Sequence, residues 1–233
     1  MLAAANLLGA STGSEIEKKV LEFAEWVKSN ESGDEPEDAD WNNPDESSIE
    51  ASLRNQGVPE RIISTLNPLS TIVKTEAIQA VELFMKTTRT GWCLVLSGCK
   101  GCGKSTAAAS YLMARTRASE NISQLPKNKM WWTAANISRV SSYVGQLENL
   151  MTLPVLVIDD LGVEYMDKNG HFNSRLDELL SYRYDNFKKT IITTNLNSVD
   201  FEKRYEKRIT SRIKEGIKFG GNFAHIKDKS LRT

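Results

Sequence analysis

The sequence predicts an α/β fold in which a mostly parallel sheet is covered by helices on both faces. Short, almost wholly apolar segments recur from residue 92 onward, as is typical of strands buried in a parallel sheet. Segments with helical periodicity lie between them, and strands that alternate with helices form parallel sheets. Such sheets bind their ligands at the carboxyl ends of the strands, so we look for functional residues there.

Each element is expected from a local pattern. The first apolar run, WCLVL, ends in Ser-Gly and is typical of a buried strand. With it we expect five strands, at residues 92–96, 129–133, 155–159, 190–194 and, as a short fifth strand, 217–219. Helices should fill the intervals, at residues 71–87, 104–117, 134–143, 173–187 and 201–214.

The amino-acid composition excludes several classes of protein. The 233 residues are 40% hydrophobic and 26% charged, which excludes a largely disordered chain. No apolar run approaches the roughly 18 residues that a membrane-spanning helix needs. The three cysteines all lie within residues 93–102 and form no disulfide framework. We therefore expect a cytoplasmic protein without a membrane partner.

The charge is unevenly distributed along the chain. Thirteen acidic and three basic residues give residues 1–52 a net charge of −10, so residues 53–233 carry +10. We expect two units: an N-terminal helix with an acidic linker over residues 1–52, and a globular domain over 53–233. The basic domain would face a polyanion, although both regions could simply be solvated surfaces.

The N-terminal segment contains one predicted helix. Ser14 and Glu17 form a capping-box pattern, and apolar residues then recur at helical spacing through residues 15–29. A helix of this length is marginal alone, so its apolar stripe should bind a partner protein or pack on the domain itself. The acidic stretch that follows is broken by Pro36 and Pro44, which is typical of a linker.

A phosphate-binding loop follows the first strand. The segment GCKGCGKS, residues 98–105, matches the P-loop pattern at every fixed position. Its glycines let backbone N–H groups face phosphate oxygens, Lys104 should reach the β- and γ-phosphates, and the Ser105 hydroxyl should bind Mg²⁺. The expected nucleotide-binding residues are Gly98, Cys99, Lys100, Gly101, Cys102, Gly103, Lys104, Ser105 and Thr106.

Two further strand ends carry polar residues that suit this loop. The strand at 155–159 runs into Asp159 and Asp160, the Walker B arrangement, in which Asp159 holds Mg²⁺ and Asp160 polarises the attacking water. The metal ligands are then Ser105 and Asp159. The strand at 190–194 is followed by Asn195, whose amide could orient the same water.

Two other patterns allow more than one interpretation. Cys99 and Cys102 form a C-x-x-C pair within the loop. Zinc needs four ligands, and only Cys93, His171 and His225 remain to complete a site. The two cysteines could instead form a redox sensor or simply occupy variable loop positions. Arg208 and Arg212 share one face of a basic helix and could neutralise a neighbouring subunit's γ-phosphate. The same helix could instead be a solvated face or a phosphate-backbone patch, and spacing does not decide between them.

Together the segments GCKGCGKST, VLVIDDLG, LLSYRYDNFKKTIITTNL and RYEKRITSRIKEG resemble the AAA+ ATPases of the DnaC/DnaI helicase-loader and IstB clade. The similarity runs from about residue 57 to the end. It implies a three-layer AAA+ domain with a five-stranded parallel sheet. Only 21 residues follow Arg212, so no C-terminal lid is expected. By this resemblance Asn195 is sensor 1, and Arg212 is the arginine finger, supported by Arg208.

The resemblance also implies a function. It is ATP-dependent DNA replication, in which a DnaB-type replicative helicase bound by the N-terminal segment is loaded onto single-stranded DNA with ATP hydrolysis as the switch. Subunits would associate through Arg212 acting in trans. The expected DNA contacts are Arg139, Tyr143, Arg115 and Arg117. An IstB-type transposition ATPase that binds duplex DNA and a transposase is the alternative. A small-molecule P-loop kinase is a third possibility, but the positions of Asn195 and Arg212 argue against it.

Overall fold

A computed structural model provides the structure of the chain. It describes residues 46–66, 74–86, 92–119, 128–140, 145–164, 170–205, 207–218, 221–227 and 230. The expected helix at residues 15–29 and most of the acidic linker lie outside these ranges. Within them, every helix is too short or too polar to cross a bilayer.

Five parallel strands form a single sheet at the centre of the molecule. They are β1 (Cys93–Gly98), β2 (Trp131–Thr133), β3 (Val155–Leu161), β4 (Lys189–Thr194) and β5 (Asn222–Ile226), in the order β2-β3-β4-β1-β5. The central strands are buried on both faces: β1 and β3 are largely apolar, and the threonines of β4 are buried beside its two isoleucines. Because β4 lies between β3 and β1, the residues that follow these three strands meet at one edge of the sheet.

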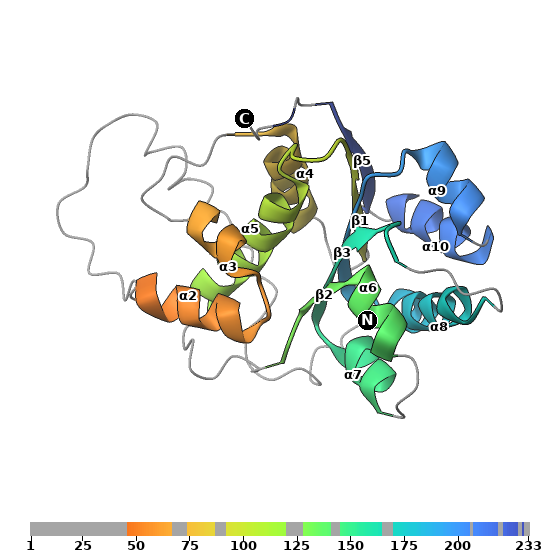
Figure 1. The fold of residues 1–233 in the computed structure, drawn as a ribbon, viewed down its shortest axis with the longest axis horizontal. Helices are drawn as coiled ribbons and strands as arrows, with labels where there is room; N and C mark the ends of the chain where they lie inside the picture. The colour runs from red at the N-terminus through yellow and green to blue at the C-terminus, as the bar shows by residue number, and fades with distance from the viewer. Residues whose placement is uncertain are drawn as a thin grey trace, which may run out of the picture.

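Helices cover both faces of the sheet and complete three layers (Figure 1). One face carries α2 (Glu46–Asn55), α3 (Glu60–Ile63), the 3₁₀ helix η1 (Ser64–Leu66), α4 (Glu76–Met85) and α5 (Lys104–Arg117). The other carries α6 (Ala134–Val140), α7 (Gln146–Thr152), α8 (His171–Asp185), α9 (Ser198–Arg204) and α10 (Lys207–Lys218). Each layer has its own apolar core against the sheet. The predicted α/β class with a five-stranded parallel sheet is confirmed, and no helix follows β5 among the described residues.

A fully buried arginine ties the second layer to the sheet. Arg183 of α8 donates hydrogen bonds to the carbonyl oxygens of Leu150, Leu153 and Lys189 and to the hydroxyl of Thr190. Burial lowers the pKa of Arg183, and these oxygen acceptors offset the cost of burying its charge. The guanidinium thereby joins the end of α7 to the start of β4. This explains why an arginine is buried in the last turn of α8.

The last expected strand was wrong. Residues 217 and 218 end α10, and the fifth strand is Asn222–Ile226. Ile209 and Ile213 bury one face of α10, and the helix continues through Gly216, where a Cβ would lie 2.3 Å from Nε1 of Trp92. Only glycine fits at this close contact. The strand begins only after Gly221 has turned the chain with a hydrogen bond to the Gly216 carbonyl.

Other boundaries differ from the expected ones for local reasons. The helix expected at 201–214 is two helices, α9 and α10, because Tyr205 adopts an extended conformation (φ −108°, ψ 152°) between them. Among the described residues, the structure adds helices that were not expected: α2, α3, α7 and the 3₁₀ helix η1. The division expected after residue 52 falls inside α2, whose Ile49 and Leu53 are buried in the first core. Residues 46–52 are therefore part of the folded domain.

Candidate nucleotide-binding site

The loop between β1 and α5 is shaped by its glycines. Gly101 and Gly103 adopt left-handed conformations, with φ of 87° and 86°. At Gly98 a Cβ would lie 2.6 Å from the Ile226 carbonyl oxygen, so no larger residue fits beside β5. The loop thus turns directly from the end of β1 into the N-terminus of α5, where backbone N–H groups and the helix dipole favour an anion. The expected nucleotide-binding residues, 98–106, are continuous across this turn.

Lys104 joins this loop to the end of β4. Its side chain is buried, and its ammonium donates to the carbonyl oxygens of Gly98 and Cys99, at 3.0 and 2.6 Å. A third hydrogen bond, 3.0 Å long, reaches the amide oxygen of Asn195. The structure therefore brings together two of the predicted site residues that are far apart in the sequence.

Asp159 and Ser105 lie in direct contact. Oδ1 of Asp159 accepts hydrogen bonds from the hydroxyls of Ser105, at 2.8 Å, and Thr193, at 2.6 Å. Burial raises the pKa of Asp159, and the two hydroxyl hydrogen bonds oppose that shift. The hydroxyl and carboxylate expected to bind the metal are thus already adjacent.

Asp160 lies at an irregularity in β3. The register between β3 and β4 shifts between Ile158 and Leu161, and Asp160 has a φ of 55°. Its backbone N–H donates to the hydroxyl of Thr193 at 2.9 Å. Such bulges redirect side chains beside functional sites, and here the bulge gives the two neighbouring carboxylates different surroundings. Sequence reasoning missed Thr193, although its place two residues before Asn195 was a usable signal.

The donor set fits a magnesium–nucleotide complex. An ammonium and turned-in N–H groups suit phosphates, and hydroxyl and carboxylate oxygens are the ligands that Mg²⁺ prefers. Mg²⁺ is usually held by one or two protein oxygens plus substrate phosphates rather than by a full protein cage. The described ranges contain no group of three His, Cys, Asp or Glu side chains that could hold a metal ion.

The two loop cysteines have different surroundings. Cys99 is exposed, whereas Cys102 is buried and its thiol donates to the Cys99 carbonyl at 3.0 Å. Burial raises the pKa of Cys102, and the nearby charge of Lys104 lowers it. Neither cysteine is part of a disulfide. Cys102 fills the space beneath Gly98, which is a packing role within the loop.

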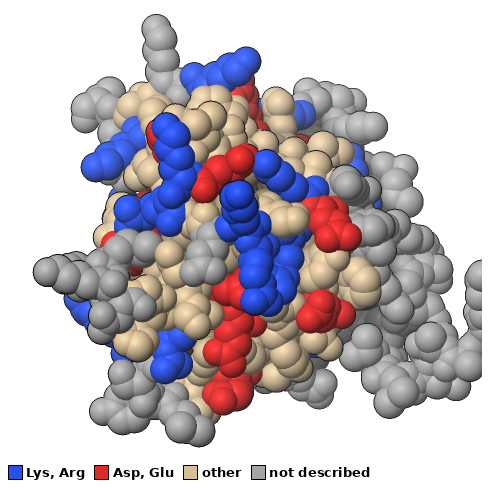
Figure 2. All heavy atoms as spheres, turned by 90° about the vertical axis from the view of Figure 1, so that its right-hand side faces the viewer, with Lys and Arg blue, Asp and Glu red and all other residues tan. Residues whose placement is uncertain are grey.

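The two α10 arginines lie apart from this group. Arg212 donates to Asp177 of α8 at 2.7 Å, and Arg208 lies 3.6 Å from the other oxygen of the same carboxylate. The side chain of Arg208 is 69% exposed, whereas that of Arg212 is 19% exposed. Among the described residues, neither has a hydrogen bond or ion pair to the loop, Asp159 or Asn195. Both lie on the face of α8, α9 and α10, where Figure 2 shows Lys and Arg mixed with acidic side chains.

The expected DNA contacts do not form one group. Arg115 and Arg117 lie at the end of α5 that is remote from the phosphate loop, whereas Arg139 is exposed on α6, in the opposite layer. Burial lowers the pKa of Arg117, and the charge of Glu46 on α2 raises it, so this guanidinium is partly used in packing α2. Tyr143 lies outside the described residues. Arg115 and Arg139 remain the more accessible candidates.

Comparison with known proteins gives a family match and a shared fold. Residues 51–233 match the model of the IstB-like ATP binding protein family. The crystal structure of the DnaC helicase loader is similar at 22% identity and a TM-score of 0.54, covering 72% of this chain and 100% of that one. The crystal structure of DnaI is similar at 21% identity and a TM-score of 0.53, covering 77% of this chain and 100% of that one. None of the curated proteins matches the sequence.

Proposed function

The chain belongs to the family of IstB-like ATP binding proteins and is an AAA+ P-loop ATPase, and on this basis we propose that it acts in DNA replication. Its task is to load a DnaB-type replicative helicase onto single-stranded DNA, with ATP hydrolysis as the switch. The observation that carries the proposal is the connected set Lys104–Asn195 and Ser105–Asp159. That set lies on a fold shared with the DnaC helicase loader.

The P-loop supplies the binding part of the site. Backbone N–H groups of residues 98–103 face the phosphates, and the ammonium of Lys104 exchanges its present carbonyl acceptors for phosphate oxygens. Ser105 and Asp159 would hold Mg²⁺, which when bound neutralises charge on the phosphates. Asp159 must be ionised for this, and its hydrogen bonds from Ser105 and Thr193 favour the ionised form.

The ends of β3 and β4 supply the hydrolytic part. Asp160 polarises the attacking water, and the bulge in β3 directs its side chain away from the buried position of Asp159. Asn195 offers a neutral amide beside the same phosphate, where it orients that water. Thr193 joins the two functions, because its hydroxyl donates to Asp159 and accepts from the N–H of Asp160.

A neighbouring subunit completes the site. Arg212, supported by Arg208, enters the neighbour's nucleotide site and neutralises charge that develops on the γ-phosphate. Within its own chain Arg212 is paired with Asp177, so it must exchange that carboxylate for phosphate when subunits associate. The exposed Arg208 shares the Asp177 pairing loosely and can make the first contact. Hydrolysis then depends on assembly.

DNA and the helicase would bind other parts of the chain. Single-stranded DNA contacts the exposed arginines, Arg115 and Arg139, of the basic domain, and the N-terminal acidic segment binds the helicase. The IstB-type alternative rests on the family match itself. In that case the same ATPase domain would bind duplex DNA and a transposase.

One binding experiment separates these functions. Affinity is measured for matched single- and double-stranded oligonucleotides, with ATP and with ADP. The loader requires preference for single strands that depends on ATP, and a pull-down of helicase with the full chain then tests the partner. Duplex preference with ATP favours the transposition ATPase. Absence of DNA binding with both nucleotides would overturn both.

A further inference from the structure

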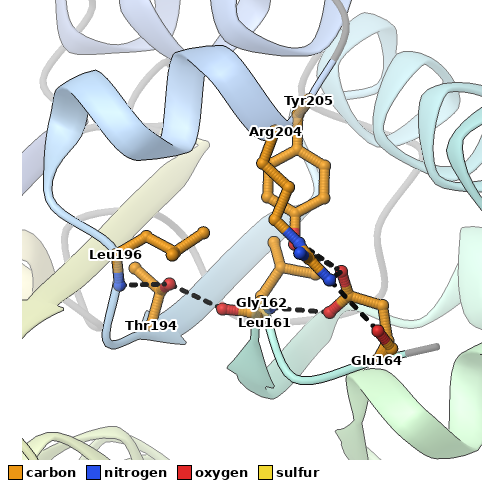
Figure 3. Close-up of polar contacts among 7 residues, drawn as sticks. All are labelled: Leu161, Gly162, Glu164, Thr194, Leu196, Arg204 and Tyr205. Atoms are coloured by element: carbon orange, nitrogen blue, oxygen red, sulfur yellow. Dashed lines mark hydrogen bonds and ion pairs between the residues drawn. The ribbon is translucent and has the colours of Figure 1, made fainter. Parts of the chain in front are cut away.

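A buried carboxylate lies just beyond the nucleotide site, three residues after the end of β3 (Figure 3). The side chain of Glu164 is 0% exposed. One oxygen, Oε2, accepts the backbone N–H of Gly162 at 2.6 Å, and the other, Oε1, accepts from Nε of Arg204 at 3.0 Å and from the hydroxyl of Tyr205 at 2.8 Å. The nucleotide mechanism above gives Glu164 no role.

Both oxygens of the buried Glu164 carboxylate have hydrogen-bond donors. An ionised carboxylate inside a protein is tolerated only when it is paired and hydrogen-bonded, and Glu164 is bonded at both oxygens. Arg204 donates again to the Glu164 carbonyl at 3.1 Å, which fixes the guanidinium against the backbone. Burial, and then the charge of Glu164, raises the pKa of Tyr205, so its hydroxyl stays protonated and donating.

On one side the Glu164 loop is joined to the end of β4. The carbonyl of Leu161 accepts from the hydroxyl of Thr194 at 2.6 Å, and that hydroxyl accepts from the N–H of Leu196 at 3.1 Å. Gly162 has a φ of 116°, and a Cβ there would lie 3.0 Å from the Leu196 side chain. Thr194 and Leu196, both drawn in Figure 3, flank Asn195, so this loop packs against the two neighbours of the residue that meets Lys104.

On the other side Glu164 holds the junction of two helices. Arg204 is the last residue of α9, and Tyr205 is the buried, extended residue that separates α9 from α10. Helix α10 begins two residues later and carries Arg208 and Arg212. The position of this junction therefore sets the direction in which α10 leaves it.

We propose that Glu164 is a positioning residue: it fixes the α9–α10 junction to the loop after Asp160 and so directs the arginines of α10 toward the nucleotide of a neighbouring subunit. This rests on the proposed function, in which Arg212 acts in trans. A subunit that lacks the Glu164 contacts keeps its own nucleotide site but is a poor donor to its neighbour. An ion pair that only stabilised the fold would not produce this asymmetry.

The test is ATP turnover in mixed assemblies of full-length variants. Lys104→Ala protein cannot use its own site but donates an intact α10, whereas Arg212→Ala protein keeps its site but donates nothing. Glu164→Gln retains an acceptor oxygen and the side-chain volume while losing the charge. We expect it to bind ATP with unchanged Kd and to lose about tenfold to a hundredfold in kcat. Mixing it with Lys104→Ala protein should restore turnover, and mixing it with Arg212→Ala protein should not.

A matched control comes from the same helix pair. Glu202 of α9 forms an exposed ion pair with Lys214 of α10, and Glu202→Gln should behave as wild type in every mixture. Tyr205→Phe removes a single hydroxyl bond to Glu164 and should show the same asymmetry as Glu164→Gln, with a smaller loss. It is the second variant in case Glu164→Gln is unstable.

The outcomes distinguish failure of the Glu164 proposal from failure of the proposed trans action of Arg212. If Lys104→Ala and Arg212→Ala proteins fail to complement one another, the trans site is wrong and the inference fails with it. If they do complement, but Glu164→Gln protein restores turnover to Arg212→Ala protein, only the inference is overturned. Loss of ATP binding in both Glu164→Gln and Tyr205→Phe would also overturn it, because the contacts would then serve the fold alone.

Discussion

The ammonium of Lys104 donates a hydrogen bond to the side-chain oxygen of Asn195, at 3.0 Å and across 91 residues of sequence. Lys104 starts the helix after β1, and Asn195 follows β4, the strand next to β1 in the sheet. Strand order therefore brings Lys104, proposed to bind phosphate, to Asn195, proposed to orient water.

Removing the Lys104 ammonium should abolish nucleotide binding. Lys104→Ala takes away the charge that meets the phosphates, and we expect ATP affinity to fall by about 100-fold or more, as befits a lost charge-assisted contact to phosphate. Titration with a fluorescent ATP analogue measures this. The control is Lys74→Ala, which removes an exposed lysine far along the chain from the loop and should bind normally. Equal affinity in both variants would contradict the assignment.

Thr193 should matter for hydrolysis more than for binding. Thr193→Val keeps the shape but removes the hydroxyl that bonds Asp159 and the Asp160 N–H. We expect turnover to fall by about tenfold, with ATP affinity nearly unchanged, and stability to fall by about 1–3 kcal/mol because a buried N–H loses its partner. Steady-state kinetics and urea unfolding report the two effects. Thr65→Val, at an exposed site, is the control. Unchanged kcat in Thr193→Val would count against the proposal that Thr193 links Asp159 and Asp160 in hydrolysis.

Asp159 predicts a pH dependence with a definite sign. Burial raises the pKa of Asp159. The carboxylate is therefore protonated at a higher pH than an ordinary aspartate, whose pKa is about 3.9. Only the ionised form binds Mg²⁺, so Mg²⁺-dependent ATP affinity should weaken as pH falls toward that raised pKa. Calorimetric titrations between roughly pH 5 and 8 measure it. The phosphates titrate as well, so the comparison is with Asp159→Asn; identical pH profiles in the two proteins would refute the prediction.

Arg183 should be a determinant of stability rather than of activity. Arg183→Met leaves the carbonyls of Leu150, Leu153 and Lys189 without their donor, and we expect a loss of about 3 kcal/mol or more in unfolding free energy. Urea denaturation at neutral pH provides the value. Arg175→Met, on the same helix but partly exposed, should cost less than about 1 kcal/mol. Similar losses for both would mean that the buried contacts contribute little.

The DNA assignment predicts a change in salt dependence. Arg139→Ala removes an exposed guanidinium, and it should weaken single-strand binding at every sequence and lower the salt slope by about 1. Fluorescence anisotropy between roughly 50 and 200 mM salt measures the slope. Arg54→Ala, which removes an arginine already paired with Glu50 and Glu60, is the control. A wild-type affinity that is flat over this salt range would exclude phosphate contacts altogether.

The parts of the site that could be predicted from the sequence are those formed by short continuous motifs. The P-loop, the Asp159–Asp160 pair and Asn195 each follow an apolar strand, and parallel topology then places strand ends together. The contacts of Glu164 with Arg204 and Tyr205 could not be predicted, since they join residues 40 and 41 positions apart.

The fold was predictable to a similar extent and for similar reasons. Four strands have strong local patterns and lie close to where they were expected. The fifth was misplaced because Ile217 and Phe219 alternate like a strand in the sequence, whereas α10, in which Gly216 packs on Trp92, continues to residue 218. The ion pair between Arg212 and Asp177 joins two helices through residues that are 35 positions apart in the sequence, and no local sequence pattern predicts it.

The ATP-hydrolysis switch is tested most directly by monitoring the release of DNA from a variant that binds ATP but cannot hydrolyse it. Asp160→Asn preserves the left-handed backbone at this position, since asparagine tolerates it, and removes the charge that polarises water. With ATP and a labelled single strand, wild-type protein should bind and then release as ATP is consumed, whereas Asp160→Asn protein should stay bound. Release at the same rate from both proteins, or binding that does not depend on the nucleotide, would contradict an ATP-hydrolysis switch.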